Sequence, residues 1–170
     1  MQDETGSMDQ RTLATLLRRV GLDPTEPRET GADLPKYDPF SDPGATDRLG
    51  RELAGRLAGL GANVISVWEE PEDMVLGHVL GLSMGIGWIR CVNADGLVAM
   101  IGSMPAAPRC VIVSDAVRAT EPITAIRNLA RVHGGEVIAI AVLLWTTELD
   151  GLADGKVATV SLAGTPAQGG

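Results

Sequence analysis

Apolar and polar positions repeat with two different periods in residues 109–144, and this stretch organises the chain. It opens with four apolar, mostly β-branched or small residues at 110–113, a run short enough for a buried strand. A helical repeat follows and stops at Gly134-Gly135, after which residues 136–144 form a second β-branched run. This order predicts a right-handed βαβ crossover. Because open α/β sheets bind ligands beyond the carboxyl ends of their strands, we expect any chemistry to centre on residues 114–124.

The rest of the chain continues the alternation of helical and strand-like segments. Helical patterns cover residues 9–20, 46–60 and about 75–82, and short apolar runs at 63–67, 88–92, 97–101 and 156–162 predict strands. These segments predict an α/β fold: a single-domain, open and mostly parallel sheet flanked by helices. We place the domain at residues 9–162, between a disordered N-terminal segment (1–8) and a C-terminal tail (163–170).

Glycine and proline mark the irregular parts of this pattern. Residues 23–43 form a long proline-rich connection, and connections of that length are usually functional or mobile. Residues 149–155 predict a Gly/Asp-rich loop. Gly77, Gly81 and Gly85 in the third helix would each cost stability relative to alanine, so they predict close backbone packing against the sheet.

Composition narrows the class of protein. Of the 170 residues, 45% are hydrophobic but only 3% aromatic, so the core must be aliphatic, as in a parallel sheet. The net charge of −8 argues against non-specific binding to nucleic acid or to an anionic membrane surface. No apolar run approaches the ~20 residues of a membrane span, and the polar N-terminus does not fit a secretory signal. We therefore expect a cytoplasmic location.

The two cysteines carry little functional signal. Cys91 and Cys110 lie in or beside apolar runs, which predicts buried free thiols, with a disulfide or a reactive thiol as the alternative. Two isolated cysteines and two distant histidines do not make a zinc site.

Residues 114–122 read S-D-A-V-R-A-T-E-P between the strand and the helix. In order and spacing this segment resembles the phosphoribosyl pyrophosphate (PRPP) loop of type I phosphoribosyltransferases, whose pattern is D-D-x-x-x-T-G-G-T. Residues 41–57, SDPGATDRLGRELAGRL, resemble the helix before the core sheet in the orotate-type members. The resemblance covers roughly residues 42–144. It implies PRPP as substrate, a nitrogenous base as acceptor and Mg²⁺ as cofactor.

The resemblance assigns the ribose hydroxyls to Ser114 and Asp115. Asp115 occupies the second acidic position of the pattern, while Ser114 replaces the first carboxylate and offers only a weaker, neutral hydrogen bond. The alternative for Asp115 is a turn or cap residue at the end of the strand.

The 5′-phosphate cradle departs from the family pattern, because Thr120, Glu121 and Pro122 stand where the family has Gly-Gly-Thr. Anion-binding loops need successive backbone N–H groups, and proline has none. Glu121 would satisfy the positive end of the helix and repel a dianion. We interpret Thr120 as a helix N-cap. Ala119 and Thr124 complete the candidate ligand-binding residues of this loop.

Cations are scarce near the expected site. Arg118 is the one compensating cation that can pair with a phosphate; the alternative is a solvated arginine. The family places a mobile catalytic loop with lysine or arginine before this strand, but residues 93–108, NADGLVAMIGSMPAAP, contain neither. Lys36 and Lys156 lie far away in sequence. No preorganised positive charge is therefore evident for the leaving group.

The pyrophosphate loop is strongly acidic. Where the family has G-P-E-T-x-G after the first core strand, this chain has W-E-E-P-E-D at residues 68–73. The resulting carboxylates disfavour pyrophosphate unless a metal ion intervenes, and such oxygen clusters can hold Mg²⁺ or Ca²⁺. The alternative is a solvated acidic loop that caps the next helix. The four carboxylates are those of Glu69, Glu70, Glu72 and Asp73.

All these departures lower the affinity of one site for anions. We therefore interpret the chain as a phosphoribosyltransferase-like domain whose PRPP transfer chemistry is impaired or lost, acting as a ligand-binding, regulatory or assembly module. One alternative is a diverged enzyme that transfers the 5-phosphoribosyl group to a nitrogenous base, with metal held by residues 69–73. Another is an unrelated nucleotide-binding α/β domain.

The expected partners follow from the same interpretation. The resemblance implies a nucleotide or sugar phosphate as ligand and a homodimer as the assembly. The apolar stretch 96–108, with Met100, Ile101 and Met104, is a candidate dimer or partner surface. A core strand explains that stretch almost as well.

Overall fold

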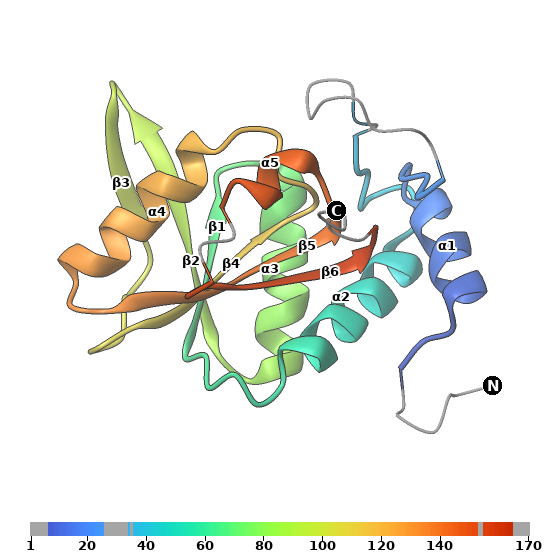
Figure 1. Ribbon diagram of the computed structural model, residues 1–170, viewed down its shortest axis with the longest axis horizontal. Coiled ribbons are helices and arrows are strands. Elements are labelled where there is room, and N and C mark those ends of the chain that lie inside the picture. Colours follow the sequence, from blue (N-terminus) through green and yellow to red (C-terminus); the bar gives the residue numbers. More distant parts are fainter. Residues whose placement is uncertain (1–6, 26–33, 35, 153–154, 165–170) are drawn as a thin grey trace.

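The computed structural model describes residues 7–25, 34, 36–152 and 155–164 (Figure 1). Most of the predicted N-terminal segment 1–8 and of the predicted tail 163–170 lies outside the described residues, so both stay predictions. In the described part of the chain, no helix combines the length and the apolar character that crossing a membrane would require.

The core of the fold is one six-stranded sheet with the order β3-β2-β1-β4-β5-β6. All neighbouring strands run parallel except β2 and β3, which form an antiparallel hairpin. The predicted α/β architecture with a mostly parallel sheet is thus confirmed. The strands are β1 (Val64–Trp68), β2 (Gly87–Ala94), β3 (Leu97–Ile101), β4 (Arg109–Ser114), β5 (Glu136–Leu144) and β6 (Ala158–Ala163).

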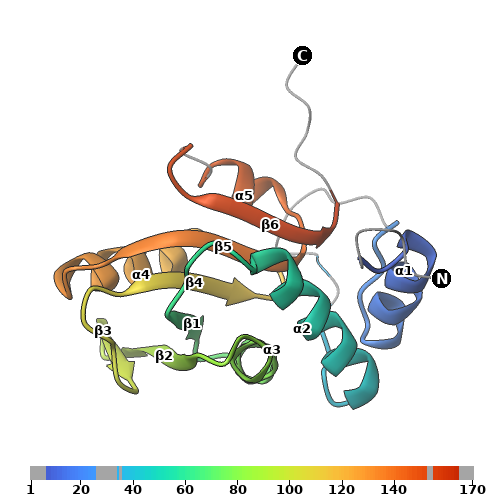
Figure 2. The same cartoon turned by 90° about the horizontal axis from the view of Figure 1, so that it is seen from below.

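Helices cover both faces of the sheet (Figure 2). Successive side chains of a strand point to opposite faces: in β4, Val111 and Val113 join the core under α2 and α3, whereas Cys110 and Ile112 join the core under α4. Both cysteines are free and buried, as predicted. The helices are α1 (Gln10–Arg19), which packs on α2, α2 (Pro43–Leu57), α3 (Pro71–Met84), α4 (Glu121–Val132) and the short α5 (Thr147–Asp150).

Local capping chemistry explains where the helix boundaries differ from the prediction. Helix α2 begins at Pro43 rather than at residue 46, because the Asp42 carboxylate accepts a hydrogen bond from the Ala45 N–H and proline fits the first turn. Helix α3 begins at Pro71, so Glu72 and Asp73 lie in its first turn instead of in a loop. Part of the predicted loop 149–155 belongs to α5, which the sequence pattern did not predict.

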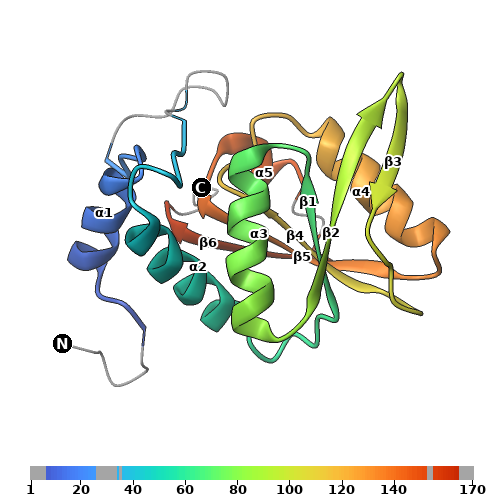
Figure 3. The ribbon, with the colours of Figure 1, turned by 180° about the vertical axis from the view of Figure 1, so that it is seen from behind.

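The β2–β3 hairpin turns at Asp95 and Gly96, which both have positive φ (52° and 82°), and it projects beyond the rest of the sheet (Figure 3). Strand β3 is an edge strand, and its side chains Leu97 and Ile101 are 74% and 46% exposed. The interpretation of residues 96–108 as a core strand is therefore wrong for β3, because none of its side chains is fully buried, although Met100 packs against the core under α4. A partner surface here stays a prediction.

Close backbone packing explains two of the three glycines of the third helical pattern. A Cβ on Gly77 would lie 2.6 Å from Cγ1 of Val67 on β1, and a Cβ on Gly81 would lie 3.1 Å from the carbonyl oxygen of Ile86. Gly85 has no such neighbour: it follows α3 as a left-handed C-cap with φ of 67°, a conformation that favours glycine. The packing prediction for Gly85 is therefore wrong.

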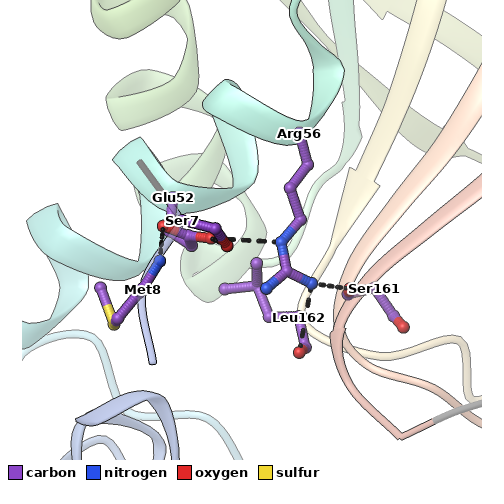
Figure 4. A network of polar contacts seen from close by, with 6 residues as sticks. All are labelled: Ser7, Met8, Glu52, Arg56, Ser161 and Leu162. Atoms are coloured by element: carbon purple, nitrogen blue, oxygen red, sulfur yellow. Dashed lines mark hydrogen bonds and ion pairs between the residues drawn. The ribbon is translucent and has the colours of Figure 1, made fainter. Parts of the chain in front are cut away.

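A polar network ties the start of the described chain to the far edge of the sheet (Figure 4). The Arg56 guanidinium donates to the carbonyl oxygen of Ser161 on β6 at 2.6 Å and pairs with Glu52 at 3.3 Å. Glu52 in turn accepts hydrogen bonds from the Ser7 hydroxyl at 2.9 Å and the Met8 N–H at 3.1 Å. Helix α2 thus binds the edge strand β6 and blocks part of its exposed hydrogen-bonding edge.

The glycine packing yields a paired prediction on stability. Gly77→Ala should lower the free energy of unfolding, because overpacking against Val67 costs about 1–3 kcal/mol and exceeds the gain in helix propensity of about 1 kcal/mol. Gly55→Ala in α2 is the matched control: no atom lies within 4 Å of its new Cβ, so it should raise stability by about 0.5–1 kcal/mol. Urea unfolding measures both, and equal effects of the two substitutions would contradict the packing account.

Candidate functional site

A cavity of about 340 Å³ lies beyond the carboxyl ends of β1 and β4, where the sequence analysis expects the site. Seven of the eleven candidate residues line it, and they come from two separate segments of the chain, the start of α3 and the loop after β4. These residues are Glu70, Glu72, Asp73, Ser114, Asp115, Arg118 and Ala119.

Four candidate residues do not line this cavity. Glu69 turns to Arg90 on β2, 3.5 Å away. Thr120, Glu121 and Thr124 belong to the start of α4, where the Thr124 hydroxyl donates to the carbonyl oxygen of Thr120 at 3.0 Å. Thr120 occupies the predicted N-cap position, but its side chain makes no capping hydrogen bond, because its backbone already has helical dihedral angles (φ −88°, ψ −19°).

The loop after β4 is held by neighbouring elements on both sides. The Asp115 N–H donates to Oδ1 of Asp73 on α3 at 3.0 Å, and the Asp115 carbonyl oxygen accepts from the N–H groups of Leu143 and Leu144 at 3.0 and 2.9 Å. Further along the loop, the buried Thr146 hydroxyl donates to the carbonyl oxygen of Val117 at 2.7 Å. These contacts fix the conformation of the loop.

The carboxylate of Asp115 is already paired within this loop. Arg118 Nη1 and Nη2 donate to Asp115 Oδ1 and Oδ2 at 2.6 and 2.7 Å, a two-pronged ion pair with the Asp115 side chain only 5% exposed. The hydrogen bonds that Arg118 donates to the Asp115 carboxylate raise the pKa of Arg118, although burial opposes this shift. The sequence left two alternatives for Arg118, a partner for phosphate and a solvated arginine. The structure matches neither alone, because the guanidinium pairs with Asp115.

Asp73 is the second buried carboxyl group of the site, with 5% of the residue exposed. Burial, and next the negative charge of Asp115, raise the pKa of Asp73 from 3.8 to about 8; the hydrogen bond from the Asp115 N–H opposes this shift. Asp73 is therefore mainly neutral at pH 7. Ser114 lies beside it and donates its own hydroxyl to the carbonyl oxygen of Ala116 at 3.0 Å.

The residues of the site do not fit the Mg²⁺ ion that the family resemblance implies. Both carboxylate oxygens of Asp115 accept hydrogen bonds from Arg118, and Asp73 is mainly neutral at pH 7. Throughout the residues that the structure describes, no group of three or more histidine, cysteine or acidic side chains is arranged to hold a metal ion.

Sequence reasoning missed three residues of the cavity wall, Lys36, Tyr37 and Trp68. Lys36 lies far from the other cavity residues in sequence, yet Lys36 and Tyr37 line the cavity at the carboxyl edge of the sheet. The length and irregularity of the connection 23–43 are the signals that could have identified them, because long connections of this kind often cover a site.

Several solved phosphoribosyltransferases superpose on this chain. The adenine phosphoribosyltransferase of Rhodothermus marinus superposes with a TM-score of 0.71 and 18% identity, over 91% of this chain and 99% of that one. The same enzyme from Thermoanaerobacter pseudethanolicus gives 0.70 and 19%, over 89% and 98%. The orotate phosphoribosyltransferase of Mycobacterium tuberculosis, solved with inorganic phosphate, gives 0.65 and 20%, over 90% and 94%.

These likenesses confirm the fold that the sequence resemblance implied, that of type I phosphoribosyltransferases. By sequence, the chain matches no protein-family model and no curated protein. At 18–20% identity the comparison establishes fold alone, so any activity must be argued from the residues of the cavity.

The raised pKa of Asp73 predicts a pH-dependent effect of Asp73→Asn. Between about pH 4 and pH 8 the folded protein keeps the Asp73 proton that the unfolded chain releases, so this carboxyl lowers stability progressively as the pH rises. The slope is at most ~1.4 kcal/mol per pH unit. Asparagine keeps an oxygen for the Asp115 N–H but does not titrate.

Urea unfolding of both proteins at pH 5, 7 and 9 tests this prediction. The stability of the variant relative to the original protein should rise from pH 5 to pH 9. A difference that stays constant over this range would show that Asp73 titrates alike in the folded and unfolded chains.

Proposed function

We propose that this chain is a phosphoribosyltransferase-like domain that binds a small molecule in the cavity at the carboxyl edge of its sheet and does not transfer a phosphoribosyl group from PRPP. The observation that carries this proposal is the ion pair between Asp115 and Arg118. In the family pattern the residue at position 115 holds the ribose hydroxyls, but here both of its oxygens already have charged partners. Ribose would have to break that pair.

The other parts of the site support the loss of transfer chemistry. Helix α4 begins with Glu121 and Pro122, so its N-terminus offers a carboxylate and lacks one N–H where a phosphate cradle would need several. Glu70 and Glu72 add negative charge at the cavity. Each of these features disfavours an anionic ligand and the stabilisation of a pyrophosphate leaving group.

One observation favours the alternative, a diverged and active phosphoribosyltransferase. Lys36 lines the cavity, and a lysine there is a cation of the kind that a leaving group requires. Release of pyrophosphate from PRPP in the presence of Mg²⁺ and a mixture of nitrogenous bases would establish this alternative. A homodimer and a cytoplasmic location remain further parts of the proposal. The nucleotide or sugar phosphate that the resemblance implies is the kind of anionic ligand that the carboxylates of the cavity disfavour.

Restoring the T-G-G-T part of the family's PRPP loop should restore phosphate binding, because we attribute the loss of this binding to the residues of the loop. We expect no thermal shift of the original protein with ribose 5-phosphate. The test variant carries four substitutions: Ala119→Thr, Thr120→Gly, Glu121→Gly and Pro122→Thr. It gains a backbone N–H group and more accessible ones at the start of α4, and it loses a carboxylate. Ribose 5-phosphate should therefore raise its melting temperature by a few degrees. Binding at a hundred times the dissociation constant adds ~2.7 kcal/mol.

The control is Glu121→Gln alone, which removes the charge but leaves Pro122 in place. It should respond weakly or not at all, because the missing N–H groups are not restored. A clear shift of the original protein with ribose 5-phosphate would contradict the proposed loss of the phosphate cradle.

A further inference from the structure

The Tyr37 hydroxyl is the unexplained polar group of the cavity. Tyr37 lines the cavity and is only 1% exposed, and its hydroxyl is the one buried side-chain nitrogen or oxygen atom, within the residues described, that has no hydrogen-bond partner. Burial raises the pKa of Tyr37 to about 12, so the hydroxyl is neutral and can both donate and accept a hydrogen bond. A buried group left unpaired is costly, which points to a partner that binds there.

A hydroxyl close to that of Tyr37 belongs to Thr46, whose own O–H donates to the carbonyl oxygen of Pro39 at 3.0 Å. Thr46 lies close enough to lower the pKa of Tyr37 against the larger effect of burial, but the two hydroxyls do not meet the geometry of a hydrogen bond. The backbone around Tyr37 is fixed against the end of α1, because the Asp38 N–H donates to the carbonyl oxygen of Val20 at 2.9 Å. A side chain on Gly21 would also clash with the carbonyl oxygen of Lys36, 2.8 Å from its Cβ. The hydroxyl is thus held in place.

The charged side chains of the cavity either neutralise each other or leave an excess of negative charge. Asp115 and Arg118 neutralise each other, while Glu70 and Glu72 face the single lysine of the wall, Lys36. A phosphate in the cavity would therefore lie near carboxylates and near Pro122, which has no N–H to donate, so its binding is disfavoured. The inner wall is apolar and includes Ile112, Val117, Ile123 and Ile126, which suits the flat or aliphatic face of an uncharged molecule.

We propose that the cavity takes an uncharged, unphosphorylated molecule of about nucleoside size, whose polar end hydrogen-bonds to the Tyr37 hydroxyl while its apolar face lies against Ile112, Val117 and Ile126. This inference rests on the proposed function, since it names the ligand class of the same cavity. It departs from the nucleotide or sugar phosphate that the family resemblance implies.

Matched pairs of probes that differ only by a phosphate test the ligand class. Adenosine and AMP, and uridine and UMP, are titrated against the full chain by ligand-observed NMR and by thermal shift. The nucleoside of at least one pair should bind at least tenfold more tightly than its monophosphate. Equal or tighter binding of the monophosphates would overturn the inference, and so would silence with all four probes.

Tyr37→Phe tests the recognition residue, because it removes only the hydroxyl. Binding of the responding nucleoside should weaken by roughly tenfold, about the value of one hydrogen bond. The free variant should be at least as stable as the original protein, because its hydroxyl has no partner to lose. A hydroxyl with a purely structural role would instead lower stability and leave binding unchanged, which would overturn the assignment of Tyr37.

Two controls separate the possible failures. Ser83→Ala removes a hydroxyl on α3 that donates to the carbonyl oxygen of Val79 and does not line the cavity, so binding should not change. Pyrophosphate release from PRPP is followed in the same samples. If pyrophosphate appears, the proposed function fails; if none appears but monophosphates bind best, only the ligand class inferred here fails.

Discussion

The site depends on the hydrogen bond that the Asp115 N–H donates to the buried carboxyl group of Asp73. This hydrogen bond joins the start of α3 to the end of β4. It places two acidic side chains close together in a region that little solvent reaches. Two buried carboxylates would repel each other strongly. The fold avoids this because Asp73 keeps its proton at neutral pH and Arg118 pairs with Asp115. These two pairings fix the conformation of the loop between β4 and α4.

The interactions that hold this loop in place are also those that disfavour an anionic ligand. A carboxylate that is satisfied by Arg118 is a poor partner for ribose hydroxyls, and a helix that begins with Glu121 and Pro122 already has its positive end neutralised. The chain thus shares its fold with phosphoribosyltransferases, while we propose that its cavity takes a different ligand. A fold fixes where a ligand binds more firmly than it fixes which chemistry follows.

Local sequence signals predicted most of the fold, and they singled out residues after β4 and at the start of α3 that line the cavity. The β-branched run of β4, the Gly134-Gly135 stop and the length of the crossover are features of short stretches, and they placed Asp115 and Asp73 at one edge of the sheet. The pairing of Arg118 could not be predicted, because it depends on the loop conformation. Tyr37 was missed because only tertiary packing returns the connection after α1 to the cavity.

The central claim is that a phosphoribosyltransferase fold is kept here while its affinity for PRPP is lost. Calorimetric titration of the unmodified protein with PRPP, in the presence of Mg²⁺, tests this claim most directly, because it needs no acceptor and no turnover. The account predicts no saturable heat at millimolar ligand. Saturable binding with a dissociation constant in the micromolar range would contradict it, since Arg118 would then have released Asp115 to the ribose.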